Sequence, residues 1–164
     1  MTRNPTQPES MDAAGWHEIV AFPDWGVRRI RAKLDTGAKT SAVHAENIEP
    51  LPPASDGSGR VRFDLVIRNR PPRRVRTIEA DIARTAEVRS SNGQIETRYV
   101  VVTPIVIGAQ RFQADFTLVS RSDMRFRVLL GRRALAGRLL VDSGAEYVVS
   151  DPPRRRARKE EPKP

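Results

Sequence analysis

The sequence predicts a mainly β fold: a small closed antiparallel β-barrel with one short helix. Three observations predict it. Apolar and polar residues alternate in several short segments, with the period of two that is typical of half-buried strands. Turn-forming Gly, Pro and Asn-Gly separate these segments. Only residues 132–139 have the character of a helix, and neither a long amphipathic helix nor an internal repeat is present.

The first predicted strands are residues 16–22 and 27–34, joined by the turn sequence Pro23-Asp24-Trp25-Gly26. Alternation is imperfect in the second strand and cleaner in residues 61–67, as expected where one face of a strand is buried. Pro71-Pro72 interrupts the pattern, and an extended pattern resumes over residues 75–82. These segments supply the first half of the predicted barrel.

Two hairpins come next in the sequence. Ser91-Asn92-Gly93 joins residues 86–90 to 95–103, because Asn-Gly tolerates the positive φ angles of tight hairpin turns. A second turn at residues 107–111 leads into a strand at 112–119. The apolar run 128–131 then enters the helix, and Leu139-Leu140-Val141 form the last strand.

The length of 164 residues suits one compact domain with a hydrophobic core. We predict a flexible polar leader over residues 1–15, a folded domain over 16–150 and a disordered basic tail over 151–164. The two end segments hold too few large apolar residues to offset the entropy of ordering. The chain has no cysteine, which excludes disulfides and thiolate metal sites.

The net charge of the chain is +9. Residues 151–164 carry three net positive charges and residues 1–15 one net negative charge, so residues 16–150 carry +7. A positive body indicates an acidic partner or substrate. The basic tail is interpreted as a solubilising segment, with weak nucleic-acid contact as the alternative. No signal-peptide core or membrane-length apolar run occurs, so we expect a cytoplasmic protein without membrane contact.

The chemistry is predicted at Asp35-Thr36-Gly37, which ends the strand 27–34. A carboxylate at this point projects from a rigid edge, the Thr hydroxyl can brace the turn, and Gly37 lets a backbone N–H approach the carboxylate. Aspartic peptidases need two such carboxylates side by side, which share one proton and hold a water. An isolated Asp-Thr-Gly is a weak signal, but Leu129-Leu130-Gly131 downstream resembles the element that retropepsins thread through the active-site loop.

Three ordered motifs extend the resemblance over about residues 16–150. Residues 33–45 (KLDTGAKTSAVHA), residues 89–101 (RSSNGQIETRYVV) and residues 122–132 (SDMRFRVLLGR) resemble the motifs of one retropepsin-like family. That family is labelled an ATP-dependent zinc protease and is associated with RimK-type glutamate ligases. The resemblance implies the retropepsin-type barrel and an aspartic peptidase that acts on oligo- or poly-glutamate.

The zinc and the ATP in that label find little support in the sequence. There is no His-Glu-x-x-His motif, and the only histidines, His17 and His44, are far apart. A zinc site normally uses three or four His, Cys or carboxylate ligands. A Gly-rich phosphate loop is also missing. We therefore predict no metal and no cofactor.

Asp142-Ser143-Gly144 is a second candidate for the catalytic pair. Only 22 residues follow Asp142, which is too few for the second lobe of a single-chain pepsin. We interpret Asp142 as the end of the last strand entering a turn. The second catalytic aspartate is then Asp35 of another copy, which requires a homodimer.

The substrate implied by the resemblance is an acidic peptide or a glutamate-tailed protein. Six basic residues near the three motifs are predicted to bind its carboxylates, with arginine suited to bidentate contact: Lys39, His44, Arg89, Arg98, Arg125 and Arg132. Each could instead belong to a solvated basic face, and His44 could be a satisfied polar group in the barrel. The alternative function is a non-catalytic module of the same fold that binds acidic peptides or nucleic acid.

Overall fold

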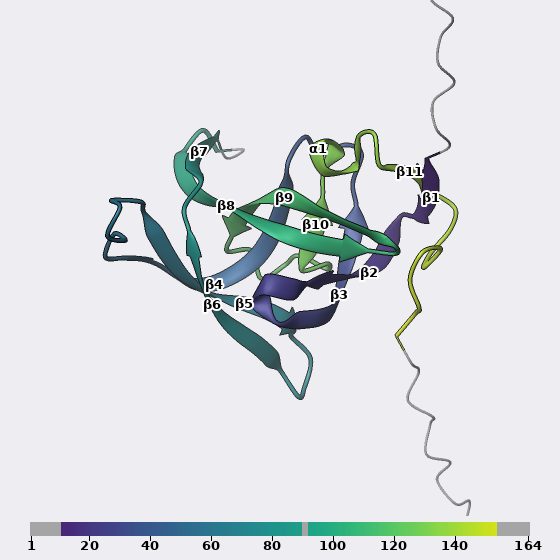
Figure 1. The fold of residues 1–164 in the computed structure, drawn as a ribbon, viewed down its shortest axis with the longest axis horizontal. Coiled ribbons are helices and arrows are strands. Elements are labelled where there is room, and N and C mark those ends of the chain that lie inside the picture. Colours follow the sequence, from purple (N-terminus) through teal and green to yellow (C-terminus); the bar gives the residue numbers. More distant parts are fainter. Residues whose placement is uncertain (1–10, 90–91, 154–164) are drawn as a thin grey trace, which may run out of the picture.

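The computed structural model describes residues 11–89 and 92–153, and Figure 1 shows their fold. The described chain is mainly β, with one short α-helix, as predicted. In chain order the strands are β1 (Asp12–Gly15), β2 (His17–Phe22), β3 (Val27–Leu34), β4 (Ser41–Leu51), β5 (Arg60–Arg68), β6 (Arg74–Asp81), β7 (Arg84–Arg89), β8 (Ile95–Ile107), β9 (Gln110–Val119), β10 (Val128–Leu130) and β11 (Leu139–Asp142). The helix is α1 (Arg132–Leu135), and a 3-10 turn covers Pro23–Trp25.

Six of the described strands form a closed ring. The order is β10-β3-β2-β8-β9-β4, and β4 bonds back to β10. The predicted closed, mainly β architecture is therefore confirmed. Two pairings, β10–β3 and β4–β9, are parallel, so the ring is mixed instead of wholly antiparallel. Outside the ring, β5 and β6 continue from β4, and β7 pairs with the first half of β8.

The core fills the interior of the ring. On β3 the side chains of Ile30, Ala32 and Leu34 are buried, while Arg29 and Arg31 are exposed, as the period of two predicts. Aromatic rings meet in the centre, where Phe22 stacks on Trp25 at 4.8 Å between ring centroids. Burying one such large side chain contributes about 1.5–3 kcal/mol. The packed aromatic side chains therefore stabilise the closed set of strands that the turns connect.

The helix is shorter than the sequence predicted. It ends at Leu135, and Gly137 follows in the left-handed conformation at φ 73°. Glycine adopts this conformation without the steric cost of a Cβ. The chain therefore leaves the helix early, and the remaining residues to Leu139 lead into β11 instead of extending α1.

The ordered domain begins earlier than the predicted boundary at residue 16. Asp12–Gly15 form β1, which pairs in parallel with β11. Parallel pairing of strands so far apart in sequence leaves no local pattern, so the sequence could not indicate it. Residues 1–10 of the predicted leader, residues 154–164 of the predicted tail, and Ser90 and Ser91 of the predicted hairpin lie outside the described residues.

A buried carboxylate joins the two ends of the described chain. Glu18 is fully buried, and its Oε1 accepts backbone N–H groups of Gly15 at 2.7 Å, Val148 at 2.7 Å and Val149 at 3.2 Å. Its Oε2 accepts the hydroxyl of Ser150 at 2.5 Å. Hydrogen bonds to a charged acceptor are stronger than neutral ones. Glu18 therefore fixes the segment after β11 against β1 and β2.

Within the described ranges, no helix has the length and apolar character that crossing a membrane requires.

Replacing Glu18 by Ala is expected to lower the free energy of unfolding by about 3 kcal/mol or more, because it leaves several buried N–H donors without an acceptor. Chemical denaturation monitored by tryptophan fluorescence measures this. Glu18→Gln should fall between Ala and wild type, since the amide oxygen can keep the Oε1 contacts. Glu87→Ala, on the exposed side of β7, is the control and should change stability by less than about 0.5 kcal/mol. An equal effect of both Ala variants would contradict the role of Glu18.

Candidate active site

The Asp35 turn, residues 35–40, connects β3 to β4. The Asp35 carboxylate accepts the backbone N–H of Gly37 at 3.0 Å through Oδ1, and its side chain keeps 26 % exposure. A Cβ on Gly37 would lie 3.1 Å from this oxygen, so glycine permits the close approach. Lys33 Nζ lies 3.5 Å from Oδ2. The turn thus presents a half-exposed carboxylate with a cation beside it.

Strand β10 passes between the two strands that carry the turn. It pairs with β3 in parallel and with β4 in an antiparallel manner. At its end, Leu130 accepts the backbone N–H of Asp35 at 2.8 Å. The backbone of Arg132 donates to Ala38 O at 2.7 Å. The predicted threading of the apolar-apolar-Gly element through the Asp35 turn is therefore found in the structure.

Gly131 is the point of closest approach in this crossing. A Cβ there would lie 2.5 Å from Thr40 O and 2.9 Å from Ala38 O. The backbone of Gly131 has an ordinary extended conformation, so it is space and not φ that requires glycine. Its N–H donates to the buried hydroxyl of Ser41 at 3.0 Å. The turn therefore depends on a contact that only glycine fits.

Arg132 contacts the turn directly. Its Nη1 donates to Thr36 O at 2.9 Å, although the side chain is exposed. Lys39, in the same turn, is exposed and free of side-chain partners among the described residues. Of the six predicted binding residues, these two lie at the Asp35 turn, and Arg132 also positions it.

Arg125 lines a hollow beside the turn. The hollow has a volume of about 290 Å³ and is formed by Trp16, Lys33, Met124, Arg125, Phe126 and Leu129. Lys33 belongs to this wall and also contacts Asp35. The hollow is therefore mainly apolar, has two cationic side chains, and adjoins the candidate catalytic carboxylate.

His44 is not available to a substrate. It is 1 % exposed, its Nδ1 accepts the backbone N–H of Arg121 at 3.0 Å, and its Nε2 lies 3.4 Å from Glu46 Oε1. The hydrogen bond from Arg73, together with the smaller effect of His44, lowers the pKa of Glu46. The alternative interpretation of His44 as a satisfied polar group is thus favoured, and we remove it from the binding set.

Arg89 and Arg98 lie on the β7–β8 arm and form no hydrogen bond or ion pair with the Asp35 turn. Arg89 is exposed near the tip of the arm. Arg98 pairs with Glu96 at 3.0 Å, and its buried Nε has no partner in the described structure. In the view of Figure 1, β7 lies at the upper left and α1 lies to its right, near the centre of the upper side. The structure therefore does not bring these two arginines into contact with Asp35.

Asp142 occupies the end of β11, as predicted. Its Oδ1 accepts the backbone N–H of Gly144 at 2.9 Å, which repeats the local geometry of Asp35 and Gly37. However, β11 pairs with β1 in a separate two-stranded sheet, outside the ring that carries Asp35. Asp142 is thus a strand-end turn residue.

Across the described ranges, no group of three or more His, Asp or Glu side chains is arranged to hold a metal ion.

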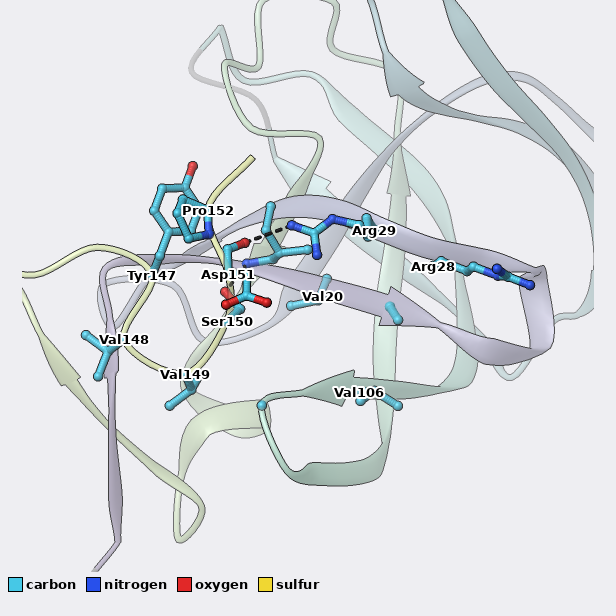
Figure 2. A pocket seen from close by; sticks show the side chains of 13 residues that line it. Val20, Arg28, Arg29, Val106, Tyr147, Val148, Val149, Ser150, Asp151 and Pro152 are labelled. Carbon is cyan, nitrogen blue, oxygen red and sulfur yellow. Dashed lines mark hydrogen bonds between the residues drawn. The ribbon is translucent and has the colours of Figure 1, made fainter. Parts of the chain in front are cut away.

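The sequence interpretation missed three residues of this site: Lys33, Trp16 and Ser41. Lys33 had a usable signal, since Arg29, Arg31 and Lys33 alternate with buried residues up to Asp35. Trp16 and Ser41 had none, because their roles depend on contacts with segments far along the chain. A larger hollow than the one beside the turn, about 510 Å³, is lined by no residue of the Asp35 turn (Figure 2).

A closed ring of strands, an Asp-Thr-Gly turn and an apolar-apolar-Gly strand threaded through it define the fold as retropepsin-like. A family profile described as "Retropepsin-like aspartic endopeptidase RimB" matches residues 13–152. The chain therefore belongs to the RimB-like family, and the resemblance noted in the sequence is confirmed.

The similar proteins fall into two groups. The chain is 36% identical over 135 residues to a protein of Shewanella halifaxensis named "Probable alpha-L-glutamate ligase", and 34% identical over 137 residues to one of Shewanella pealeana with the same name. The matches cover 82% and 84% of this chain but only 29% and 30% of those proteins, so the chain spans about a third of their length. A crystal structure of a Legionella pneumophila protein of unknown function has the same fold, with a TM-score of 0.72 and 24% identity. That alignment covers 86% of this chain and 100% of the Legionella chain.

Gly131→Ala is expected to lower the free energy of unfolding by roughly 1–3 kcal/mol, because the new Cβ meets backbone atoms that have no room to move. Thermal unfolding by circular dichroism measures the change. Gly59→Ala is the control, because its Cβ would meet the flexible side chain of Ile82 at an ordinary 3.4 Å. If Gly131→Ala were as stable as Gly59→Ala, the threaded contact would not constrain the turn.

Proposed function

We propose that this protein is an aspartic-type peptidase that hydrolyses peptide bonds in acidic, glutamate-rich peptides or tails. The single observation that carries the proposal is the Asp35 carboxylate, held at a rigid strand end by β10 and still 26 % exposed. A carboxylate fixed by structure but open to solvent can act on a water molecule and a bound peptide. Membership of a family described as retropepsin-like endopeptidases supports the same chemistry.

The reaction needs two carboxylates that share one proton. The ionised carboxylate accepts a proton from a water molecule, whose oxygen attacks the carbonyl carbon of the peptide. The protonated carboxyl donates its proton to the carbonyl oxygen. The tetrahedral intermediate then collapses, the C–N bond breaks, and a proton moves to the leaving nitrogen. Asp35 supplies one of these two carboxylates.

The second carboxylate is assigned to Asp35 of a second copy. Among the described residues, the Asp35 side chain contacts the Lys33 ammonium and the Gly37 backbone N–H, and neither is a carboxylate. Thr36 and Gly37 are exposed, so this face of the turn is open to another chain. A two-fold axis through the turn brings equivalent residues of two copies together. We therefore propose a homodimer with one shared site.

Positive charge around the turn supports an acidic substrate. Lys33 and Arg125 line the hollow beside Asp35, and Lys39 and Arg132 lie at the turn itself. Residues 16–150 carry the larger part of the positive charge of the chain. Arg89 and Arg98 stay in the proposed set as residues of the β7–β8 arm. The glutamate-ligase names of the similar proteins are compatible with a glutamate-containing substrate.

Asp35→Asn is expected to reduce turnover of an oligo-α-glutamate peptide by roughly 10²–10⁴-fold, because the amide cannot accept a proton from water. Mass spectrometry of the peptide products at several pH values measures this. Asp142→Asn is the matched control, since it makes the same change in the same local geometry outside the ring. The peptidase proposal fails if wild type leaves the peptide intact, or if Asp35→Asn cleaves it at the wild-type rate.

A mixing experiment tests the shared site. With the wild-type concentration fixed, adding an equal amount of Asp35→Asn chain and allowing exchange should reduce cleavage to about half, because half of the wild-type chains then sit in mixed dimers. Asp142→Asn chains added in the same way should cause no loss. Undiminished cleavage in the presence of Asp35→Asn would show that each copy works alone.

The non-catalytic binding module is the second candidate, and the half-buried ion pair of Asp35 with Lys33 is the observation in its favour. In that case Asp35 would be structural, and an acidic peptide would bind without being cleaved. Equilibrium binding separates the two functions: a binding module shows no turnover in wild type and retains peptide affinity in Asp35→Asn.

A further inference from the structure

The outer face of β3 carries three cations in a row. Arg29, Arg31 and Lys33 alternate with the buried residues Ile30, Ala32 and Leu34, so they project from the same side of the strand. We call these three residues the β3 cation row. Successive members stand about 6.6–6.8 Å apart, which is two residues of strand rise. The row ends at Lys33, whose Nζ lies 3.5 Å from the Asp35 carboxylate.

The row joins two hollows. At one end Lys33 lines the hollow beside Asp35, together with Arg125 and Phe126. In the middle, Arg31 places its guanidinium carbon 5.0 Å from the centre of the Phe126 ring, on which Arg125 also lies at 5.8 Å. At the far end Arg29 lines the larger hollow of about 510 Å³ with Arg28 (Figure 2). The row therefore spans about 13 Å between the two hollows.

Few acidic groups neutralise this face. Arg29 donates to the main-chain carbonyl of Asp151 at 2.8 Å and not to its carboxylate (Figure 2). Arg31 and Arg125 form no ion pair among the described residues, and the Lys33 partner is Asp35 itself. Glu146, on the segment after β11, lies with its Oε2 3.0 Å from His17 Nε2. By contrast, Arg60 and Arg62 on β5 both pair with Glu79.

The C-terminal segment leaves the row accessible. It packs on β2, where Ile19 donates its backbone N–H to Ser150 Oγ at 2.8 Å, and it contacts the row at Arg29 through the Asp151 carbonyl. Ile19 is buried, while its register partner Arg31 on β3 remains exposed. The segment from Tyr147 to Pro152 thus forms one wall of the larger hollow and meets the row at Arg29, whose side chain stays exposed (Figure 2).

We propose that the β3 cation row is an extended binding track for the part of an acidic peptide that lies outside the catalytic turn. This inference rests on the proposed function and names a positioning surface for it. In an extended peptide, alternate side chains point to one side at the same spacing as the row. Every second glutamate therefore faces one cation, and the arginines can hold carboxylates in bidentate contact. Substrates long enough to reach Arg29 gain affinity that short ones lack.

Equilibrium binding to the full chain carrying Asp35→Asn tests the track without turnover. The probe is a fluorescein-labelled oligo-α-glutamate of about twelve residues, read by anisotropy at fixed salt. Adding Arg29→Gln and Arg31→Gln should weaken its binding about tenfold, as expected for two exposed charge pairs. The control pair, Arg70→Gln with Arg111→Gln, removes the same charge from exposed sites elsewhere and should change binding by less than about twofold. Equal losses in both pairs would show a general charge effect and overturn the track.

The spacing has its own test. Two peptides with the same number of glutamates, one of Glu-Ser repeats and one of Glu-Ser-Ser repeats, carry the same charge at different periods, and the serines make the second peptide longer. The Glu-Ser peptide should bind more tightly and lose more affinity in the Arg29→Gln and Arg31→Gln chain, because only its period matches the row. If both peptides lose equally, or if a single-stranded oligonucleotide shows the larger loss, the row is not a track for extended acidic peptides.

Turnover separates this inference from the proposed function. In the chain with Asp35 intact, the Arg29→Gln and Arg31→Gln changes should raise KM for the twelve-residue peptide and spare kcat. Cleavage that is independent of the row would overturn the track and leave the peptidase proposal standing. Binding that depends on the row, without any cleavage by wild type, would overturn the peptidase proposal and leave the binding track standing.

Discussion

Strand β10, only three residues long, hydrogen-bonds to β3 on one side and to β4 on the other. This double pairing closes the ring of strands, and it also fixes the turn that joins β3 to β4. The Asp35 N–H, the Ala38 carbonyl and the Ser41 hydroxyl are all satisfied by residues 130–132. Because buried backbone groups need partners, the turn and the threaded strand can only form together. The position of the Asp35 carboxylate is therefore set by the pairing of β10 with β3 and β4, strands far from β10 in sequence.

The distribution of charge divides the molecule into two kinds of surface. On the β5–β6 ribbon, arginines and glutamates face each other across the strands, and such cross-strand pairs balance locally. Around the Asp35 turn and along β3, the cations outnumber the carboxylates they contact. A surface whose charges are balanced within the chain attracts no particular ligand, whereas an unbalanced one raises the local concentration of anions. Both surfaces are rich in arginine, so composition alone does not separate them.

The sequence predicted those elements of the fold and of the site that depend on residues close together in the chain. The strand before Asp35, the glycines at 37 and 131 and the turn at Gly108 all leave local patterns, and the structure contains them. The parallel pairing of β1 with β11 leaves no local sequence pattern. The predicted start of the folded domain at residue 16 is therefore too late, because β1 precedes it. The hydrogen bond of His44 with Arg121 joins residues far apart in sequence, which only the fold brings close. Gly137 is typical of the residue that follows a helix end, and in the structure its left-handed conformation follows the helix that ends at Leu135.

The clamp at Glu18 has a geometric consequence for any neighbouring domain. It binds residues 148–150 to the start of β2, and β1 lies against β11, so both ends of the described chain emerge from one side of the ring (Figure 1). The similar glutamate-ligase proteins are about three times as long as the stretch they share with this chain. A sequence fused at either end would start from that same side, and linker length would then set how often it meets the carboxylate turn. Moving a fused domain from one terminus to the other would leave it attached on the same side of the ring of strands.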